Sequence, residues 1–263
     1  MLALFLGDSD LPKLILKKIK KNKIKYLIID LSKKQIYKKD KFSYYFSIGQ
    51  FGKIINTLKE NKCKTAIFAG QINRPNLSKL KFDIKGLLYL PKLIKASKLG
   101  DAEILKKIIF ILKKEKIKVI SSLFYNTELA LKTGIYTKVF PNTNDLKSIR
   151  FGIKKLYKLN PNNHTQGLIV DNKKIIATES RKGTKQMILD IKKKEIINPI
   201  LIKFPKKKQD LRIDLPTIGL ATLKDCKKSN IKGIVLKSMK NIFLDKKKSI
   251  NFANKNKIFI ISI

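Results

Sequence analysis

Residues 1–30 read MLALFLGDSDLPKLILKKIKKNKIKYLIID, and this stretch decides the fold class. The apolar runs Leu2 to Leu6 and Lys25 to Ile29 have the length of buried strands, and Leu14 to Ile19 between them is typical of a helix. A strand, a helix and a second strand in this order form a βαβ unit, whose two strands run parallel in one sheet. The N-terminus therefore predicts an α/β protein.

The same alternation continues to about residue 125. The next expected elements are a helix with one buried face over Phe51 to Leu58, a strand over Thr65 to Ala69, a helix that Asp101 can cap and a strand over Val119 to Ser121. Strands that alternate with helices favour a doubly wound parallel sheet. We therefore predict a Rossmann-like α/β domain over residues 1–128.

A second domain is expected after a break in the pattern. Periodicity weakens from Asn126 to Asn144, where Thr, Gly, Pro and Asn are frequent, so we place a linker at 129–144 and a second α/β domain at 145–263. Its expected elements are a helix near Asp145, a hairpin of 167–170 and 174–178, a helix over 184–191, a strand over 199–203, a helix over 221–229, strands over 233–236 and 242–245, a helix over 247–255 and a strand over 258–261.

Composition excludes several classes of protein. With 43% hydrophobic and 30% charged residues, the 263-residue chain can bury a sizeable core. Two cysteines and one histidine cannot build a disulfide framework or the usual four-ligand zinc site, which favours a reducing, cytosolic setting. Lysines interrupt every long apolar stretch, and the N-terminal apolar run is too short for a signal peptide, so we expect no membrane span.

Charge is the most unusual property of the chain. Sixty Lys and Arg against 19 Asp and Glu give a formal charge of +41, which indicates nucleic acid, anionic lipid or a phosphorylated substrate as partner. The lysines are spread through the whole sequence and are not interleaved with aromatics, which argues against nucleic acid and fits a solvated surface. The four arginines, Arg74, Arg150, Arg181 and Arg212, are stronger candidates for phosphate or carboxylate recognition.

Two strand ends in the first domain are candidate binding loops. The loop Gly7 to Pro12 has the position of a phosphate-binding turn, although a plain strand-to-helix turn explains it as well. The segment Phe68 to Pro75 ends a buried strand at Gly70 and delivers Arg74 to the sheet edge where open α/β sheets bind ligands. Arg74 is therefore a candidate phosphate ligand, with an ordinary surface arginine as the alternative.

The segment Lys203 to Gly219 carries the strongest chemical pattern. If residues 210–214 are extended, Asp210, Arg212 and Asp214 point to one face. The two acids would then lie about 13 Å apart, too far to share one ion, and an edge strand with a ladder of charges is the structural alternative.

Elimination favours carboxylate chemistry over the other catalytic classes. The sole histidine, His164, lies among asparagines, and the chain has no Gly-x-Ser-x-Gly elbow or Walker loop. Asp, Gln and Thr oxygens remain, which are ligands that Mg²⁺ prefers, and this ion polarises phosphoryl oxygens. The sequence therefore favours phosphoryl-group hydrolysis.

Taken together, these segments resemble a known family over nearly the whole chain. The resemblance rests on residues 7–12, 49–53, 68–75, 100–101, 166 and 183–184, on Lys203, on the strand that begins at Gly233 and above all on Gln209-Asp210-x-Arg212-x-Asp214-Leu-Pro-x-Ile-Gly219. It is to the UDP-2,3-diacylglucosamine pyrophosphatases of the LpxI type. The resemblance implies two α/β domains with a Mg²⁺-dependent site between them. It also implies hydrolysis of UDP-2,3-diacylglucosamine to UMP and 2,3-diacylglucosamine 1-phosphate (lipid X), a step of lipid A biosynthesis at the cytoplasmic face of the inner membrane.

On this basis we assign expected roles to ten residues. Asp214 and Asp210 are the expected catalytic carboxylates, with Asp214 also the metal ligand. The residues expected to bind substrate are Gly70, Arg74, Gly183, Thr184, Lys203, Gln209, Arg212 and Thr217. The expected partners are the nucleotide-sugar lipid and an anionic membrane surface, with a homodimer left open and no nucleic acid.

The chain departs from the family pattern at three places, one of which is Asn163, where an acid commonly precedes the Gln166 strand. The first loop carries Asp8 and Asp10 where the family is usually rich in glycine, and Lys182 and Lys185 stand where the family usually has acids. Glu179 is the nearest remaining acid and could substitute for them. Two alternatives follow from the charge and from these changes: a basic nucleic-acid-binding α/β protein, and a non-catalytic nucleotide-binding relative.

Overall fold

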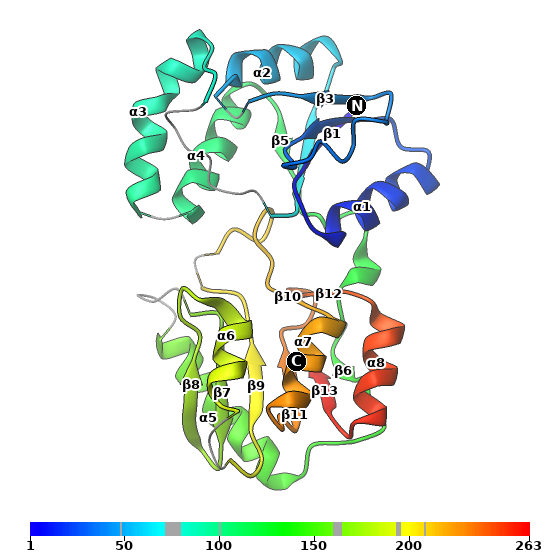
Figure 1. Cartoon of the computed structure of the whole chain (residues 1–263), viewed down its shortest axis with the longest axis vertical. Coiled ribbons are helices and arrows are strands. Elements are labelled where there is room, and N and C mark those ends of the chain that lie inside the picture. Colours follow the sequence, from blue (N-terminus) through cyan, green and yellow to red (C-terminus); the bar gives the residue numbers. More distant parts are fainter. Residues whose placement is uncertain (48, 72–79, 100, 160–164, 193–195, 208) are drawn as a thin grey trace. The chain divides into compact units, whose positions relative to one another are not determined.

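The computed structural model describes residues 1–263 except 48, 72–79, 100, 160–164, 193–195 and 208 (Figure 1). The chain divides into unit 1, which comprises Met1–Asn126 and Arg212–Asp214, and unit 2, which comprises Thr127–Leu211 and Leu215–Ile263. Arg212–Asp214 thus groups with unit 1, although it lies within the range 145–263 that we expected to form the second domain. The expected linker, 129–144, contains a strand of the unit 2 sheet and the start of a helix in that unit.

Unit 1 is an α/β unit around one parallel sheet. Its elements are β1 (Leu2–Leu6), α1 (Asp10–Lys21), β2 (Tyr26–Asp30), β3 (Ser43–Tyr45), α2 (Phe51–Glu60), β4 (Thr65–Ala69), α3 (Ile84–Leu99), α4 (Asp101–Lys114) and β5 (Lys118–Val119). The strand order is β3-β2-β1-β4-β5, and each neighbouring pair is parallel. The prediction of a parallel α/β sheet is confirmed.

Helices cover both faces of this sheet, which explains its continuous apolar strands. Ala3 and Phe5 of β1 face α2 and α4, whereas Leu2, Leu4 and Leu6 face α1. Because successive side chains of a strand point to opposite faces, a strand that is buried on both sides is apolar throughout.

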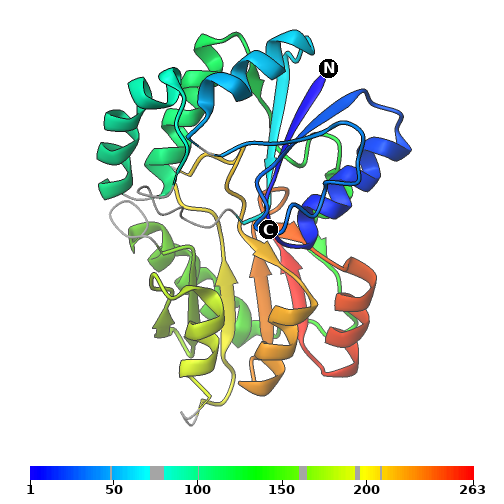
Figure 2. The same ribbon diagram turned by 45° about the horizontal axis from the view of Figure 1, so that its top comes forward.

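Unit 2 is built on a mixed sheet. Its elements are η2 (Thr127–Leu129), β6 (Gly134–Ile135), α5 (Thr143–Leu159), β7 (Gly167–Asp171), β8 (Lys174–Thr178), α6 (Gly183–Asp190), β9 (Ile200–Lys203), β10 (Thr217–Ile218), α7 (Leu220–Lys228), β11 (Gly233–Leu236), β12 (Ile242–Phe243), α8 (Lys246–Lys255) and β13 (Phe259–Ser262). The strand order is β6-β13-β11-β9-β7-β8, with β9, β11 and β13 parallel and side by side (Figure 2). The β7–β8 hairpin is antiparallel, as predicted.

The second sheet is also covered on both faces. Side chains of α6, α7 and α8 pack on the face that carries Leu201 and Ile234, and α5 packs on the face that carries Ile202 and Val235. Strands β10 and β12 form a separate small parallel pair. The second unit is therefore mixed α/β, as the sequence predicted.

Two sequence predictions fail. The first sheet includes β3 and the first unit includes α3, neither of which was expected. Residues Leu211–Ile213 form a turn, so the prediction that 210–214 is extended is wrong. Across the described ranges, the structure contains no helix that is both long and apolar enough to cross a membrane.

Candidate functional site

The carboxyl end of β9 carries a buried lysine with several polar partners. Lys203 is only 4% exposed, and its Nζ donates to Glu179 Oε1 and Oε2 at 3.0 and 3.1 Å. The same Nζ donates to Thr184 Oγ1 at 2.6 Å and lies 3.5 Å from Gln166 Oε1. We call Lys203, Glu179, Thr184 and Gln166 the Lys203 cluster.

Neighbouring strands and one helix position this cluster. Glu179 follows β8, where its backbone N–H donates to Gly167 O at 2.9 Å and its carbonyl accepts from Thr165 Oγ1 at 3.2 Å. A Cβ at Gly167 would lie 3.2 Å from Glu179 Oε2, so the absence of a side chain there leaves room for the carboxylate. Thr184, in the first turn of α6, donates its hydroxyl proton to Glu179 Oε1 at 2.6 Å.

Two of the sequence-predicted residues therefore meet directly. Lys203 contacts Thr184, and Gly183 precedes Thr184 with a φ of +82° that favours glycine. The sequence indicated no role for Gln166 beyond the family resemblance, and Glu179 was expected only as a substitute acid. The sequence of β9 could have indicated the contact with an acid. The strand is apolar except for its final lysine, and a lysine in a buried strand needs an opposite charge nearby.

The segment 209–219 is organised differently from the prediction. Gln209 closes a turn, since its Oε1 accepts from Lys206 N at 2.8 Å and its N–H donates to Lys206 O at 3.1 Å. Ile213 packs against the unit 1 core cluster that contains Phe5 and Phe68. Alternating polar and apolar residues suggested a strand, but here the alternation belongs to a turn that anchors one isoleucine.

The other residues of this segment are only partly covered. Asp210 and Asp214 are half-buried, and Arg212 is exposed. Thr217 lies in β10 and is exposed, with its hydroxyl donating to Leu215 O at 3.2 Å.

In unit 1, the loops after β1 and β4 are joined by their backbones. Asp8 N donates to Gln71 O at 2.9 Å, and Gln71 N donates to Asp8 O at 2.8 Å. Gly70 makes this possible, because its φ is +90° and a Cβ there would lie 2.6 Å from Asp8 O and from Pro12 Cγ. The strand order reverses between β1 and β4, which is where open α/β sheets bind ligands. Arg74 lies outside the described residues.

The loop after β1 contains strained backbone. Ser9 has φ 105° and ψ 176°, a conformation that essentially only glycine adopts without cost. Asp10 is the first residue of α1 and pairs with Lys13 at 3.1 Å, with both side chains exposed. Pro12 lies in the first turn of the helix, as the turn interpretation requires.

Acids and one tyrosine surround the end of this sheet. Asp30, at the end of β2, accepts from Ser32 N at 2.9 Å, from Ser32 Oγ at 2.6 Å and from Tyr37 N at 3.0 Å. Burial raises the pKa of Tyr37 to about 12, and the charges of Asp30, Asp8 and Asp10 add to the increase. Considering only the described residues, the buried Tyr37 hydroxyl has no hydrogen-bond partner.

A metal could be held here only by few protein ligands. Within the part of the chain that the structure covers, no group of three or more His, Cys, Asp or Glu side chains could hold an ion. Mg²⁺ is usually bound by one or two carboxylates together with water and substrate phosphates. Asp214 and Asp210 are each half-buried and carry the type of ligand group that Mg²⁺ uses.

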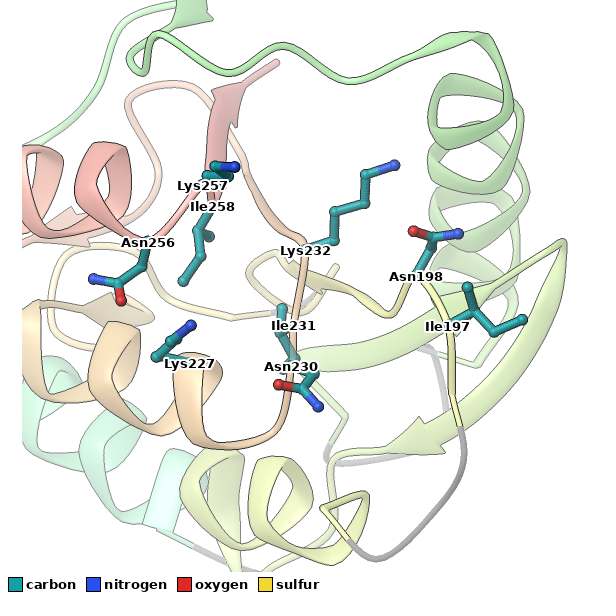
Figure 3. Close-up of a pocket in the computed structure, with 9 residues that line it drawn as sticks. All are labelled: Ile197, Asn198, Lys227, Asn230, Ile231, Lys232, Asn256, Lys257 and Ile258. Atoms are coloured by element: carbon teal, nitrogen blue, oxygen red, sulfur yellow. The ribbon is translucent and has the colours of Figure 1, made fainter.

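The cavity in Figure 3 lies at the amino-terminal ends of strands β9, β11 and β13 of the unit 2 sheet. It has a volume of about 270 Å³, and Asn198, Lys232 and Ile258, which precede β9, β11 and β13, contribute to its lining. Lys227 lies in the last turn of α7, where its positive charge complements the helix C-terminus. Lys232 forms an ion pair with Asp145 at 2.9 Å. Ligands of open α/β sheets bind at the carboxyl ends of the strands, so we do not assign this cavity to the site.

The comparisons with known proteins agree with the division into two units. Residues 1–129 match the model of the LpxI N-terminal domain, and residues 132–261 match the model of the LpxI C-terminal domain. A protein from Caulobacter vibrioides, described as UDP-2,3-diacylglucosamine pyrophosphatase LpxI, is 29% identical over 224 residues, which are 82% of this chain and 80% of that protein. Because both domains match in order over nearly the whole sequence, the chain belongs to the LpxI family.

Proposed function

We propose that the chain hydrolyses the pyrophosphate bond of UDP-2,3-diacylglucosamine to UMP and 2,3-diacylglucosamine 1-phosphate, in the synthesis of lipid A. The observation that carries this proposal is the match of both LpxI domains, together with a relative that bears this activity in its name. The chain also has the Asp210, Arg212 and Asp214 pattern that first indicated phosphoryl chemistry.

The reaction needs a proton acceptor and cations near the phosphates. Hydrolysis places a water oxygen on one phosphorus and breaks the bond to the bridging oxygen, which leaves with the bonding electrons and gains a proton. We assign Asp214 to hold Mg²⁺ and Asp210 to accept a proton from the water. A bound Mg²⁺ would offset the charge of the phosphoryl oxygens.

Cationic and polar residues are assigned to the substrate. Arg212 and Arg74 would neutralise the pyrophosphate, which suits the planar, multidentate guanidinium group. Lys203 is given a positioning role in addition, since its buried ammonium group orients Glu179 and Thr184. Gly70, Gly183, Gln209 and Thr217 remain proposed substrate contacts.

The exposed lysines at the start of α6 are consistent with an anionic substrate. Lys182 and Lys185 replace family acids and are both exposed at the start of this helix. They add positive charge beside Thr184, which we propose as a substrate ligand. Their effect would be to strengthen binding of phosphate through attraction that salt weakens.

We further propose that the enzyme works at the inner face of the inner membrane. Its proposed substrate is a lipid, and the net charge of +41 would attract the chain to anionic headgroups. Basic residues close to such a surface contribute about 1 kcal/mol each.

The test is release of UMP by the purified protein. With UDP-2,3-diacylglucosamine in detergent and Mg²⁺ present, we expect UMP, and we expect EDTA to abolish its release. Asp210→Asn should lower the rate by about 10²–10⁴-fold, the usual contribution of a positioned acid or base. Asp214→Asn should also lower the rate, because it removes the carboxylate assigned to hold Mg²⁺. Asp190→Asn, at an exposed acid on α6, is the matched control and should leave the rate unchanged.

Each alternative function predicts a different result. A protein that binds the nucleotide sugar without releasing UMP would be a non-catalytic relative. Tight, steeply salt-dependent binding of DNA or RNA without UMP release would favour a nucleic-acid-binding protein. UMP release that is equal in wild type and Asp214→Asn would overturn the assigned mechanism.

A further inference from the structure

Helix α3 of unit 1 exposes large apolar side chains along one face. Ile84 is 80% exposed, Leu87 55% and Leu88 69%, and their spacing of three and four residues places them on the same side of the helix. Ile94 further along α3 is also exposed, as is Phe110 on the neighbouring helix α4. A contiguous apolar face of this kind indicates an interaction surface.

The opposite face of α3 is packed into unit 1, so the exposed face has a defined direction. Tyr89 packs edge-on against Phe51 of α2, with ring centroids 6.2 Å apart, and Ala96 is buried. Helix α3 also lies against α4, at the edge of unit 1 in Figures 1 and 2. The exposed apolar residues are therefore not part of a loosely attached segment.

A carboxylate fixes the start of α3 to the start of α2. Asp83 accepts from Gly86 N at 2.7 Å, from Gly52 N at 3.1 Å and from Lys53 N at 2.8 Å. Burial alone would raise the pKa of Asp83, but these three backbone donors outweigh it and hold the pKa below its usual value. The acid that precedes α3 is thus turned inward.

The remaining charge on α3 is entirely positive. Residues 84–99 contain four lysines and no Asp or Glu, and Lys92, Lys95 and Lys98 are exposed. Exposed leucine and isoleucine side chains on the same face as exposed lysines suit contact with an anionic membrane surface. Lysines favour the headgroups, while the apolar side chains enter the acyl boundary.

We propose that this face of α3, formed by Ile84, Leu87 and Leu88 with Lys92, Lys95 and Lys98, docks on an anionic lipid bilayer. The inference deepens the proposed function, because an enzyme whose substrate has its acyl chains in a bilayer gains access to it by docking there. The proposal assigns the membrane contact to one face of α3, whereas the net charge alone does not indicate which part of the chain makes it.

A tryptophan introduced at this face gives a direct test, because the chain contains none. Leu88→Trp should show a blue-shifted emission with phosphatidylcholine vesicles that contain phosphatidylglycerol, and brominated acyl chains should quench it. Ile197→Trp in unit 2 is the control, since Ile197 is 81% exposed but lies outside the proposed surface. Its emission should not change. An unshifted Leu88→Trp emission on vesicles that bind the protein would overturn the proposal.

Vesicle flotation measures the contribution of the apolar side chains. Combined Ile84→Ser, Leu87→Ser and Leu88→Ser should weaken partition to the anionic vesicles at least about tenfold, because each substitution removes favourable apolar burial. Ile197→Ser should float like wild type, and circular dichroism confirms that both variants are folded. Flotation of the triple variant at the wild-type level would contradict the assignment.

Two further results distinguish docking on a bilayer from contact between two copies of the chain and from loss of catalysis. A blue shift of Leu88→Trp that needs no vesicles and increases with protein concentration would show that a second copy covers the face, and it would overturn the proposal. The binding tests contain no substrate, so loss of the proposed pyrophosphatase activity would leave their outcome intact. In detergent micelles, where no bilayer is needed, the triple serine variant should release UMP at the wild-type rate.

Discussion

The two units hold the segments at the carboxyl ends of their strands in place by different interactions. In unit 1, backbone groups join the loops after β1 and β4, through Gly70 and a strained Ser9. In unit 2, the end of β9 is organised by side chains, with the buried charges of Lys203 and Glu179 in direct contact. Each unit thus positions its loops by a different kind of interaction.

The difference illustrates two requirements of a phosphate site: close approach of the ligand to the main chain, and a fixed orientation of the side chains. Loops joined through their backbones, with a glycine at the closest approach, allow a ligand to come near the main chain. A buried ion pair fixes side-chain orientation but needs every partner, because a single charge left in a buried place is costly. The two ends should therefore respond differently to single substitutions.

The largest effect is expected from breaking the ion pair in unit 2. Lys203→Met leaves the Glu179 carboxylate buried without its cation, so we expect the free energy of unfolding to fall by about 3–5 kcal/mol. The double variant Lys203→Met/Glu179→Gln removes both charges and should recover a large part of that loss. Urea unfolding followed by circular dichroism measures both values.

An exposed lysine on the adjoining helix serves as the control. Lys185→Met in α6 should change stability by less than about 0.5 kcal/mol, as surface substitutions usually do. A Lys203→Met variant as stable as Lys185→Met would mean that charge plays no part in fixing the end of β9.

Much of the fold follows from the sequence because buried strands are short and apolar. The strands at Thr65–Ala69 and Gly233–Leu236 were predicted with their observed bounds. Helix α3 was missed, because its apolar residues lie on both faces and it contains Gly86 and Pro91, which are unfavourable inside helices. The missed helix is the one whose outer face we propose to dock on a bilayer.

The site could be predicted only in part. Lys203 and Thr184 were both selected from the sequence and do meet, but their contact with Glu179 depends on where β8 ends relative to β9. Alternation in 210–214 indicated a strand, whereas the structure has a turn with Ile213 in the unit 1 core. The pattern of polar and apolar residues in a short segment does not show that one of them, here Ile213, packs against a core formed by residues far away in the sequence.

The second effect concerns the backbone contact in unit 1. Gly70→Ala adds a Cβ at φ +90° and places it 2.6 Å from Asp8 O, so we expect a loss of roughly 2–3 kcal/mol in unfolding free energy. Gly183→Ala is the matched control, because its φ of +82° is similar but a Cβ there meets nothing within 4 Å. The difference between the two variants measures the contact between the loops, and equal losses would show that only backbone strain matters.

The smallest effect is a gain in stability. Ser9 adopts a backbone conformation in which a side chain costs about 1–3 kcal/mol, so Ser9→Gly should raise the free energy of unfolding by about 1 kcal/mol after the extra flexibility of glycine in the unfolded chain is subtracted. Lys23→Gly is the control, because Lys23 has a φ of 52° in the ordinary left-handed region, where less strain can be released. Thermal unfolding should show a higher midpoint for Ser9→Gly than for Lys23→Gly. If Ser9→Gly lowers stability instead, the loop after β1 is held by its serine, and the backbone would not be what organises this end of unit 1.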